Sequence, residues 1–332
     1  MRRWLAALAL LIVAVAVGLT LWHQSTSGSP PARAAAAPKQ TPRAAKPTAK
    51  AAKPKAKAPK ATASPAAPAS PARVGLGVYN PSDSWSSAVS FGQQAGQPVR
   101  YVLVYLEDGD PFPVALADQA YAGGAELVVQ FRPAMSMAQV AAGDDDAYLD
   151  SLIEQVRQFG HPVILSFAPE ANGNWYQYGW TQTPPAQYLA AWSHVMSLAA
   201  GVSDITWMET LNIDYSGSGP LSDYFVPGVG IYGLDGYYAS PDQGTGAGAG
   251  AGDTFASVFG GTLAQLRQLT SRPVMISETG IPQDFQAAGI PGLIQGVRAN
   301  HLAGLIWLDA NIDGGNWAMT SGGFAALRAQ GT

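Results

Sequence analysis

Residues 162–176 read PVILSFAPEANGNWY, and this stretch changes character at its midpoint. Its first part, 162–167, is almost continuously apolar, which is typical of a strand buried on both faces of a parallel sheet. Its second part is polar and aromatic and contains Glu170. In barrels of parallel strands, functional side chains lie just beyond the carboxyl ends of the strands. The stretch therefore predicts a buried strand that ends in residues with a chemical role.

Seven further apolar runs of similar length lie between residues 74 and 308. They cover 74–79, 101–106, 126–131, 204–208, 228–231, 273–276 and 303–308. Helices are expected between most of them, at 150–159, 187–199 and 254–269, with only a short helix at 221–225. Eight alternating β and α units in about 260 residues predict an α/β fold, the (β/α)8 TIM barrel. A doubly wound open sheet is the alternative, but no glycine-rich dinucleotide-binding fingerprint follows the first run.

The N-terminal part of the chain has a different composition from the rest. Two arginines precede an apolar run at 4–22 that is about long enough to cross a bilayer, and the positive-inside rule sends the following chain outside. We expect residues 1–23 to be a signal anchor helix or a cleaved signal peptide. Residues 24–73, rich in Ala, Pro and Lys, predict a disordered linker. Residues 74–332 are expected to form an extracytoplasmic catalytic domain, secreted or anchored to the outer face of the cell membrane.

Charge is divided between the same two parts. Residues 1–73 carry twelve of the nineteen Lys and Arg and no acid, so 74–332 carry seven basic against twenty-three acidic residues, a net charge of −16. Nucleic acid binding needs a basic footprint, so this acidic domain argues against it and suits a neutral polymer such as a polysaccharide. The chain has no Cys, and an exported domain large enough to bury its own core can do without disulfides.

Metal sites and Ser-His triads lack suitably placed residues. His161, His194 and His301 precede predicted strands or lie in a predicted helix, away from the carboxyl ends of the strands. The three Asp at 144–146 favour the N-terminus of a helix over a calcium site. We expect a monomer with no metal and no cofactor, whose only contact with a membrane is its N-terminal segment.

Two glutamates follow apolar runs. Glu170 comes after the run at 162–167 and Glu278 after the run at 273–276, so in a barrel both would reach the same end. Glycoside hydrolysis needs such a pair, because one carboxyl group protonates the leaving oxygen while the other attacks the anomeric carbon or activates water. The alternative, two ordinary exposed or ion-paired glutamates, is weakened by the scarcity of basic partners in the domain.

Aromatic residues collect near the same strand ends. They are Tyr79, Trp175, Tyr176, Tyr178, Trp180, Trp207, Tyr237, Tyr238, Trp307 and Trp317. Sugar rings pack their C–H faces on aromatic rings, so this collection suits a glycan-binding trough. Aromatic side chains of the barrel core are the competing explanation.

The motifs around these residues resemble those of glycoside hydrolase family 26. The run at 167–176 resembles the acid/base motif of that family, in which Glu precedes Asn-Gly and, five residues after the Glu, a Trp. The run at 273–280, PVMISETG, is similar to its nucleophile strand, and 233–237, GLDGY, to its strand-six motif. The resemblance extends over about 75–315, in order, and implies a retaining hydrolase with a (β/α)8 barrel.

The resemblance implies roles for single residues. Glu170 would be the general acid/base and Glu278 the nucleophile, with Tyr237 as its hydrogen-bonding neighbour. Trp175 and Trp307 would stack on the sugars near the cleaved bond. The substrate-binding residues expected in full are Asn172, Asn174, Trp175, Tyr237 and Trp307.

The implied activity is endo-hydrolysis of a β-linked polysaccharide with retention of configuration, on β-1,4-mannan first and mixed-linkage β-glucan second. The sequence has Pro169 where mannanases of the family often have His, and Ser166 where they often have Arg. Because those positions help to orient the sugar, the choice of polysaccharide stays open. A non-catalytic, wall-associated glycan-binding protein and a glycosyl-transferring enzyme are the remaining alternatives.

Overall fold

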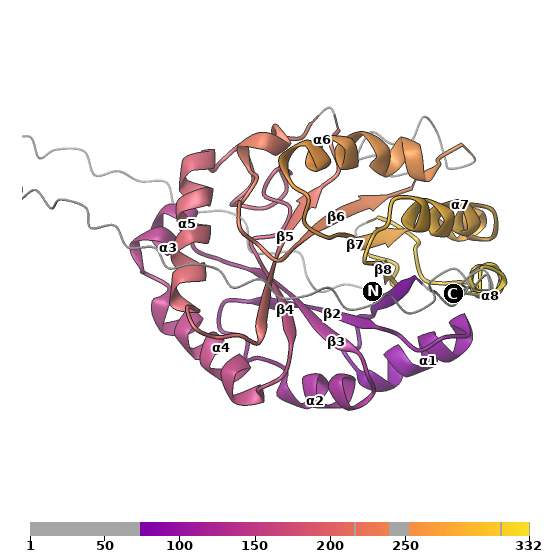
Figure 1. The fold of residues 1–332 in the computed structure, drawn as a ribbon, viewed down its shortest axis with the longest axis horizontal. Coiled ribbons are helices and arrows are strands. Elements are labelled where there is room, and N and C mark those ends of the chain that lie inside the picture. Colours follow the sequence, from indigo (N-terminus) through magenta and orange to yellow (C-terminus); the bar gives the residue numbers. More distant parts are fainter. Residues whose placement is uncertain (1–73, 216, 239–251, 313, 332) are drawn as a thin grey trace, which may run out of the picture. The chain divides into compact units, whose positions relative to one another are not determined.

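The computed structural model describes residues 74–331 except 216, 239–251 and 313 (Figure 1). Eight parallel strands close into a barrel, because each strand pairs with the next and the last pairs with the first. The strands are β1 (Gly75–Tyr79), β2 (Tyr101–Glu107), β3 (Glu126–Arg132), β4 (Val163–Phe167), β5 (Ile205–Asn212), β6 (Ile231–Tyr237), β7 (Val274–Gly280) and β8 (Gly304–Leu308). The predicted (β/α)8 barrel is confirmed. The expected signal segment, 1–23, and linker, 24–73, lie outside the described residues.

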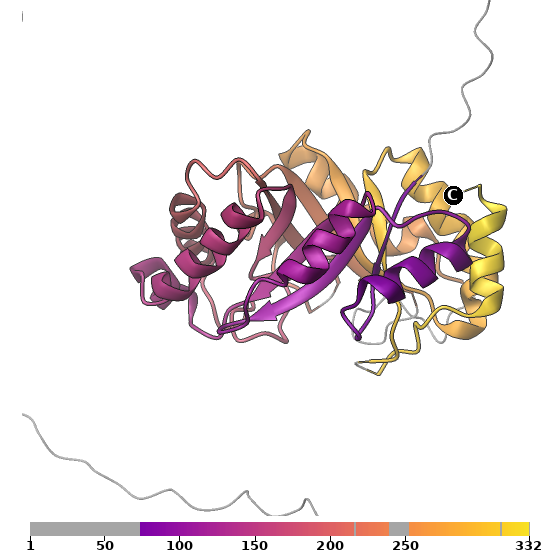
Figure 2. The same ribbon diagram turned by 90° about the horizontal axis from the view of Figure 1, so that it is seen from below.

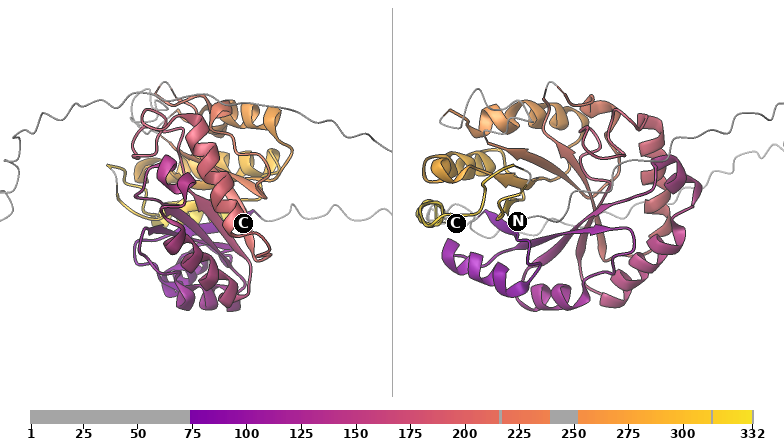
Figure 3. Two further views of the ribbon diagram at one scale, coloured as in Figure 1. Left: turned by 90° about the vertical axis from the view of Figure 1, so that its left-hand side faces the viewer. Right: turned by 180° about the vertical axis from the view of Figure 1, so that it is seen from behind.

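Helices connect the strands and cover the outside of the ring (Figure 2 and Figure 3). They are α1 (Trp85–Ala95), α2 (Val114–Ala122), α3 (Met137–Ala142), α4 (Asp146–Phe159), α5 (Pro185–Leu198), α6 (Gly261–Leu269), α7 (Gln286–Ala299) and α8 (Ser321–Ala329). Short segments add η1 (Leu221–Asp223), the π-helical η2 (Ala256–Gly260) and η3 (Gln283–Phe285). Among the helices of the described ranges, none combines the length and the apolar content that crossing a membrane requires.

The predicted helices correspond to observed ones with altered ends. The helix expected at 150–159 is α4, which already begins at Asp146, so the third of the three consecutive Asp lies in its first turn. The helix expected at 254–269 is divided into η2 and α6. At 221–225 only the single turn of η1 forms.

Side chains of the strands alternate between two cores. Eight apolar residues fill the inside of the barrel: Tyr101, Leu103, Val128, Ile164, Met208, Ile231, Met275 and Ile306. Their neighbours along each strand point outward and form the larger core beneath the helices. Because the alternation has a period of two, it also decides which residues face inward at the carboxyl ends of the strands. We call this end of the barrel the mouth.

The sixth strand is displaced from its predicted position. The apolar run at 228–231 predicts it too early, because β6 runs from Ile231 to Tyr237 and contains two glycines and a buried Asp. Neighbouring side chains leave no room for a larger residue at either glycine. A Cβ at Gly233 would lie 2.2 Å from Ser277 Oγ, and one at Gly236 would lie 2.7 Å from the side chain of Ile213. Close packing therefore removes the apolar signal from this strand.

Candidate active site

The chain adopts an unusual conformation where β4 ends. Ala168 and Glu170 have φ angles of +46° and +58°, in the left-handed region that costs a residue with a Cβ about 1–2 kcal/mol. Two backbone bonds hold this turn: Ala168 N donates to Phe131 O of β3 over 2.9 Å, and Glu170 N donates to Thr210 O of β5 over 2.8 Å. Glu170 is thus fixed between two neighbouring strands, and such backbone strain is often found at functional sites.

Two aromatic side chains, Trp175 and Tyr215, lie beside Glu170. Trp175 Nε1 donates to Glu170 Oε2 over 3.0 Å, and the Trp175 side chain remains 41% exposed. Its ring lies on Gly173, where a Cβ would come within 2.5 Å of the indole. Tyr215 stacks against Trp175 at 6.1 Å between ring centroids, and its hydroxyl donates to Asn174 Oδ1 over 3.1 Å. The loops after β4 and β5 therefore present an exposed ring next to a carboxyl group.

A bulge in β7 brings Glu278 to the mouth. The pairing of β7 with both neighbouring strands shifts at this point, and Glu278 becomes the partner of Asp235 on β6. Ser277 also faces inward, because its hydroxyl donates to Asp235 Oδ1 over 2.5 Å. A bulge lets two consecutive residues of a strand point to the same side, and bulges are common beside active sites. The Tyr237 hydroxyl donates to Glu278 Oε1.

Tyr237 is held in place by Trp317, from the loop between β8 and α8. The two rings stack with centroids 4.3 Å apart and an angle of 29° between their planes. Trp317 in turn lies against Gly280, where a Cβ would lie 2.4 Å from the indole Cγ. The Glu-Thr-Gly sequence at the end of β7 thus combines the carboxyl group at Glu278 with the space that Trp317 needs.

Asp235 lies between the two glutamates. It is almost fully buried, and burial raises its pKa well above the usual value, with a further contribution from the negative charge of Glu170. The hydrogen bond from Ser277 acts in the opposite direction without cancelling the rise. Asp235 also pairs with Glu278 along the strands, so both glutamates lie near it. The mouth therefore gathers three carboxyl groups, of which Asp235 favours its neutral form.

The expected binding role of Asn172 needs correction. Its side chain is fully buried. Its Nδ2 donates to the backbone oxygen of Asn212 over 2.8 Å, and its Oδ1 accepts from the backbone nitrogen of the same residue over 2.9 Å. Because Asn212 ends β5, Asn172 joins the loop after β4 to that strand. The Asn172 side chain is therefore enclosed by the protein, whereas Asn174 is exposed on the same loop.

The expected stacking role of Trp307 needs a similar correction. Trp307 is only 1% exposed and belongs to the core beneath the helices, because its neighbour Ile306 occupies the inward position on β8. Its Nε1 donates to the backbone oxygen of Trp317 over 2.9 Å. Trp307 therefore supports Trp317, the tryptophan that lies next to Tyr237.

Four of the seven expected site residues thus lie around the mouth with their side chains near one another: Glu170, Trp175, Tyr237 and Glu278. Trp317 was expected near the strand ends but without a role, and Tyr215 and Ser277 were not expected. Extending the fifth run to Asn212 would have placed Tyr215 directly after a strand, so a signal for it existed. No signal in the sequence indicates the bulge at Ser277.

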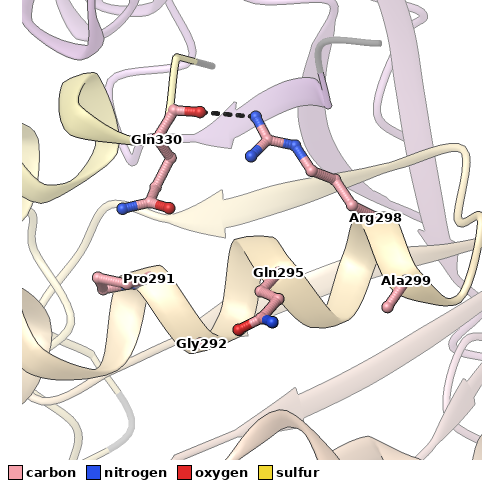
Figure 4. Close-up of a pocket in the computed structure, with 6 residues that line it drawn as sticks. All are labelled: Pro291, Gly292, Gln295, Arg298, Ala299 and Gln330. Atoms are coloured by element: carbon pink, nitrogen blue, oxygen red, sulfur yellow. Dashed lines mark hydrogen bonds between the residues drawn. The ribbon is translucent and has the colours of Figure 1, made fainter. Parts of the chain in front are cut away.

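A hollow of about 480 Å³ lies on the helix layer and not at the mouth (Figure 4). Its lining residues are Pro291, Gly292, Gln295, Arg298, Ala299 and Gln330. Arg298 Nη2 donates to the backbone oxygen of Gln330 over 2.8 Å, which joins α7 to the end of α8. The lining contains no carboxyl group, so this hollow lacks the residues for the chemistry discussed above.

The fold and the site define a (β/α)8 barrel with two glutamates at the carboxyl ends of β4 and β7. No model of a known protein family matches the chain. Endoglucanase H of Acetivibrio thermocellus is 26% identical over 207 residues, which are 59% of this chain and 23% of that protein. The chain thus spans about a quarter of the length of this relative.

Solved structures match over most of the chain. A family 26 β-mannanase from Bacteroides ovatus has a TM-score of 0.57 at 15% identity, over 78% of this chain and 87% of that one. The catalytic domain of a family 26 endo-β-1,4-mannanase from Bacillus sp. JAMB-750 has a TM-score of 0.55 at 16% identity, over 77% and 86% of the two chains. The chain has the fold of these family 26 proteins, in agreement with the resemblance of its motifs.

Proposed function

We propose that this chain is an extracytoplasmic endo-β-glycanase that cleaves a β-linked polysaccharide with retention of configuration. The observation that carries the proposal is the convergence of Glu170 and Glu278 around Asp235 at the mouth. Each glutamate has its own polar neighbour, since Trp175 donates to Glu170 and Tyr237 donates to Glu278. The different partners give two carboxyl groups of one site different surroundings, as an acid and a nucleophile require.

The reaction would proceed in two displacements. In the first, a carboxylate oxygen of Glu278 forms a bond to the anomeric carbon while the glycosidic C–O bond breaks, and Glu170 transfers its proton to the leaving oxygen. In the second, Glu170 takes a proton from water, and the water oxygen displaces Glu278 from the anomeric carbon. The Tyr237 hydroxyl, already directed at Glu278, stabilises the carboxylate before attack and after release.

The proposed substrate is β-1,4-mannan, with mixed-linkage β-glucan as the second candidate. The mannanase names of the structural relatives support the first, and the name endoglucanase of the sequence relative supports a β-glucan. The exposed ring of Trp175 suits either polymer, because pyranose rings of both kinds offer C–H faces for stacking. Hydrolysis and transfer to a second sugar share the covalent intermediate, so product analysis must separate them.

Purified protein incubated with mannan, lichenan, cellulose and xylan tests the proposal. We expect new reducing ends from mannan or, failing that, from lichenan. Glu278→Ala should abolish turnover, and Glu170→Ala should retain the first step only for substrates with good leaving groups. Glu154→Ala, on the exposed face of α4, is the matched control and should keep full activity.

Two outcomes would contradict this assignment. If the parent cleaves a polysaccharide and both active-site variants cleave it at similar rates, the site lies elsewhere. If nuclear magnetic resonance shows inverted configuration in the first product, Glu278 acts as a base. A parent that binds a glycan without cleaving any of the four polymers would instead support the non-catalytic alternative.

The proposed location has its own test. The apolar run at 4–22 after two arginines supports export, with the barrel domain outside the cytoplasmic membrane. Fractionation should find the protein with the membrane, or outside the cell when the segment is cleaved. Full-length protein in the cytosol would contradict the proposed location without affecting the proposed activity.

A further inference from the structure

The basic residues of the barrel domain are distributed unequally between its two ends. Residues 74–332 contain seven arginines and no lysine. Four lie in the last turns of helices, which run back from the mouth and end at the opposite face, and two lie one or two residues before strands at that face. These six are Arg100, Arg157, Arg267, Arg272, Arg298 and Arg328. The seventh, Arg132, is the last residue of β3. Among the residues that the structure describes, no other Lys or Arg lies at the mouth.

The guanidinium of Arg132 has three neighbours, Tyr105, Glu107 and Tyr176. It occupies an inward position of β3, and its guanidinium carbon lies 4.8 Å from the ring centroid of Tyr105. Its Nη2 donates to Glu107 Oε1 over 2.9 Å. Its Nε is buried and has no hydrogen-bond partner in the protein, although the side chain as a whole is 31% exposed. A buried N–H of a charged group without a partner is costly, so this donor is oriented but unsatisfied.

The ion pair with Glu107 does not account for this arrangement. Glu107 has a side chain that is 66% exposed, and an ion pair in water contributes little to stability. The same contact forms between Arg157 and Glu154 on the surface of α4, where no other group holds the guanidinium. Arg132 differs from Arg157 because its planar group is also fixed by Tyr105 and faces the mouth.

The path of a polymer across the mouth determines on which side of the cleaved bond Arg132 lies. The two catalytic glutamates must flank the cleaved bond, so the polysaccharide crosses the line from the end of β4 to the end of β7. The strand order divides the ring at this line into β5 and β6 on one side and β8, β1, β2 and β3 on the other. Trp175 and Tyr215 line the first side. Arg132 and Tyr105 lie on the second.

We propose that Arg132 binds the substrate, as the residue that recognises the sugar on the β1–β3 side of the cleaved bond through two neighbouring hydroxyl groups. The inference rests on the proposed glycanase function. A guanidinium offers parallel N–H donors in one plane, which match a pair of adjacent oxygens. Glu107 and the net charge of −16 of the domain disfavour an anionic sugar, so the recognised unit is neutral. Recognition by hydroxyl geometry makes Arg132 a residue that distinguishes one hexose from another.

Two substitutions at position 132 test the proposal. Arg132→Gln should lower kcat/KM on the cleaved polysaccharide by about tenfold to a hundredfold, as expected for lost charge-assisted hydrogen bonds. Arg132→Lys keeps the charge without the planar donors and should recover only a small part of the loss. In a Glu278→Ala background, Arg132→Gln should weaken the binding of mannohexaose and cellohexaose, measured by calorimetry, by a similar factor. Unchanged thermal midpoints will exclude misfolding as the cause.

Two matched variants separate binding from a structural role. Arg157→Gln removes an equivalent surface ion pair and should leave kcat/KM unchanged. Glu107→Gln removes the ion pair of Arg132 while keeping the guanidinium, and it should change kcat/KM by no more than about twofold. If Glu107→Gln and Arg132→Gln lose activity equally, Arg132 acts through its ion pair and the proposal is overturned.

The activity of the parent separates this proposal from the proposed function. If the parent cleaves a polysaccharide and the Arg132 variants cleave and bind as well as the parent, only the role of Arg132 is overturned. If the parent cleaves none of the polymers and the Glu278→Ala variant binds neither hexasaccharide, the proposed function fails, and this inference fails with it.

Discussion

Gly280 shows how one missing side chain can support the position of another residue, here Glu278 two residues earlier. Any Cβ at this position would push against the indole of Trp317, which stacks on Tyr237, the donor to Glu278. We expect Gly280→Ala to lower kcat at least tenfold and to reduce the free energy of unfolding by about 1–3 kcal/mol, as overpacking does. Gly261→Ala, where no atom lies within 4 Å of the added Cβ, is the control and should affect neither quantity adversely.

Tyr237 offers a second test at the residue scale. Tyr237→Phe removes one hydroxyl but keeps the ring that stacks on Trp317, so stability should change little. A hydrogen bond to a charged group contributes about 1.5–3 kcal/mol, so kcat/KM should fall about tenfold to a hundredfold. Tyr188→Phe removes a hydroxyl near Glu209, on the helix side of β5, and should reduce stability without reducing activity. Equal loss of activity in both variants would contradict the assigned role of Tyr237.

Sequence reasoning at this scale predicted the positions of the charged residues better than those of the aromatic or amide ones. Glu170 and Glu278 follow apolar runs, and the structure places both near Asp235 at the mouth. Asn172 and Trp307 lie in equally suggestive positions, but both are buried. The difference arises from the direction in which each side chain points, and that direction depends on bulges and turns that a linear pattern does not contain.

At the scale of elements, the apolar runs predicted seven of the eight strands within a few residues. The runs end too early in β5 and β7, because these strands continue into polar residues whose side chains face the mouth. The β6 prediction fails for the opposite reason, since close neighbours replace its apolar side chains by glycine and Asp235. The apolar pattern of the sequence thus predicts the strands well where they form the core and poorly where they line the mouth.

At the scale of elements, the burial of Glu209 on β5 predicts that the free energy of unfolding depends on pH. It is fully buried between β5 and the segment before β6, where its Oε2 accepts from Val226 N over 2.8 Å. Burial raises its pKa well above the usual value of about 4.3. The folded protein therefore retains this proton at pH values where the unfolded chain has lost it, so the group opposes folding increasingly as the pH rises above that of the unfolded carboxyl group.

A substitution that cannot titrate tests this argument. Glu209→Gln keeps the shape and an oxygen acceptor for Val226 N, but its stability should not change with pH in this way. Relative to the parent, the variant should therefore be more stable at pH 8 than it is at pH 4, as measured by urea unfolding at both values. A difference between the two proteins that is the same at both pH values, or is larger in favour of the variant at pH 4, would show that the pKa of Glu209 is not raised.

At the scale of the whole molecule, the distribution of trypsin sites makes the domain boundary testable. Twelve of the nineteen Lys and Arg lie in residues 1–73, where the sequence predicts a disordered linker, and Arg73 is the last of them. The barrel closes only when β1 pairs with β8, so its domain should resist cleavage as one unit. Limited trypsin digestion should yield a stable fragment that begins at Val74. Rapid cleavage within 74–332 to smaller stable fragments would contradict a single domain.

The direction of β1 has a consequence for how the molecule would work when it is attached to something. This strand starts at Gly75, at the end of the barrel opposite the mouth, as every strand of a parallel barrel does. A support that holds the preceding segment, whether a cell envelope or a chromatography bead, is therefore connected to the barrel at the end opposite the mouth. The opening with the glutamates lies at the other end of the barrel from this point of attachment, so an attached protein keeps its attachment point apart from the end where a long insoluble fibre would bind.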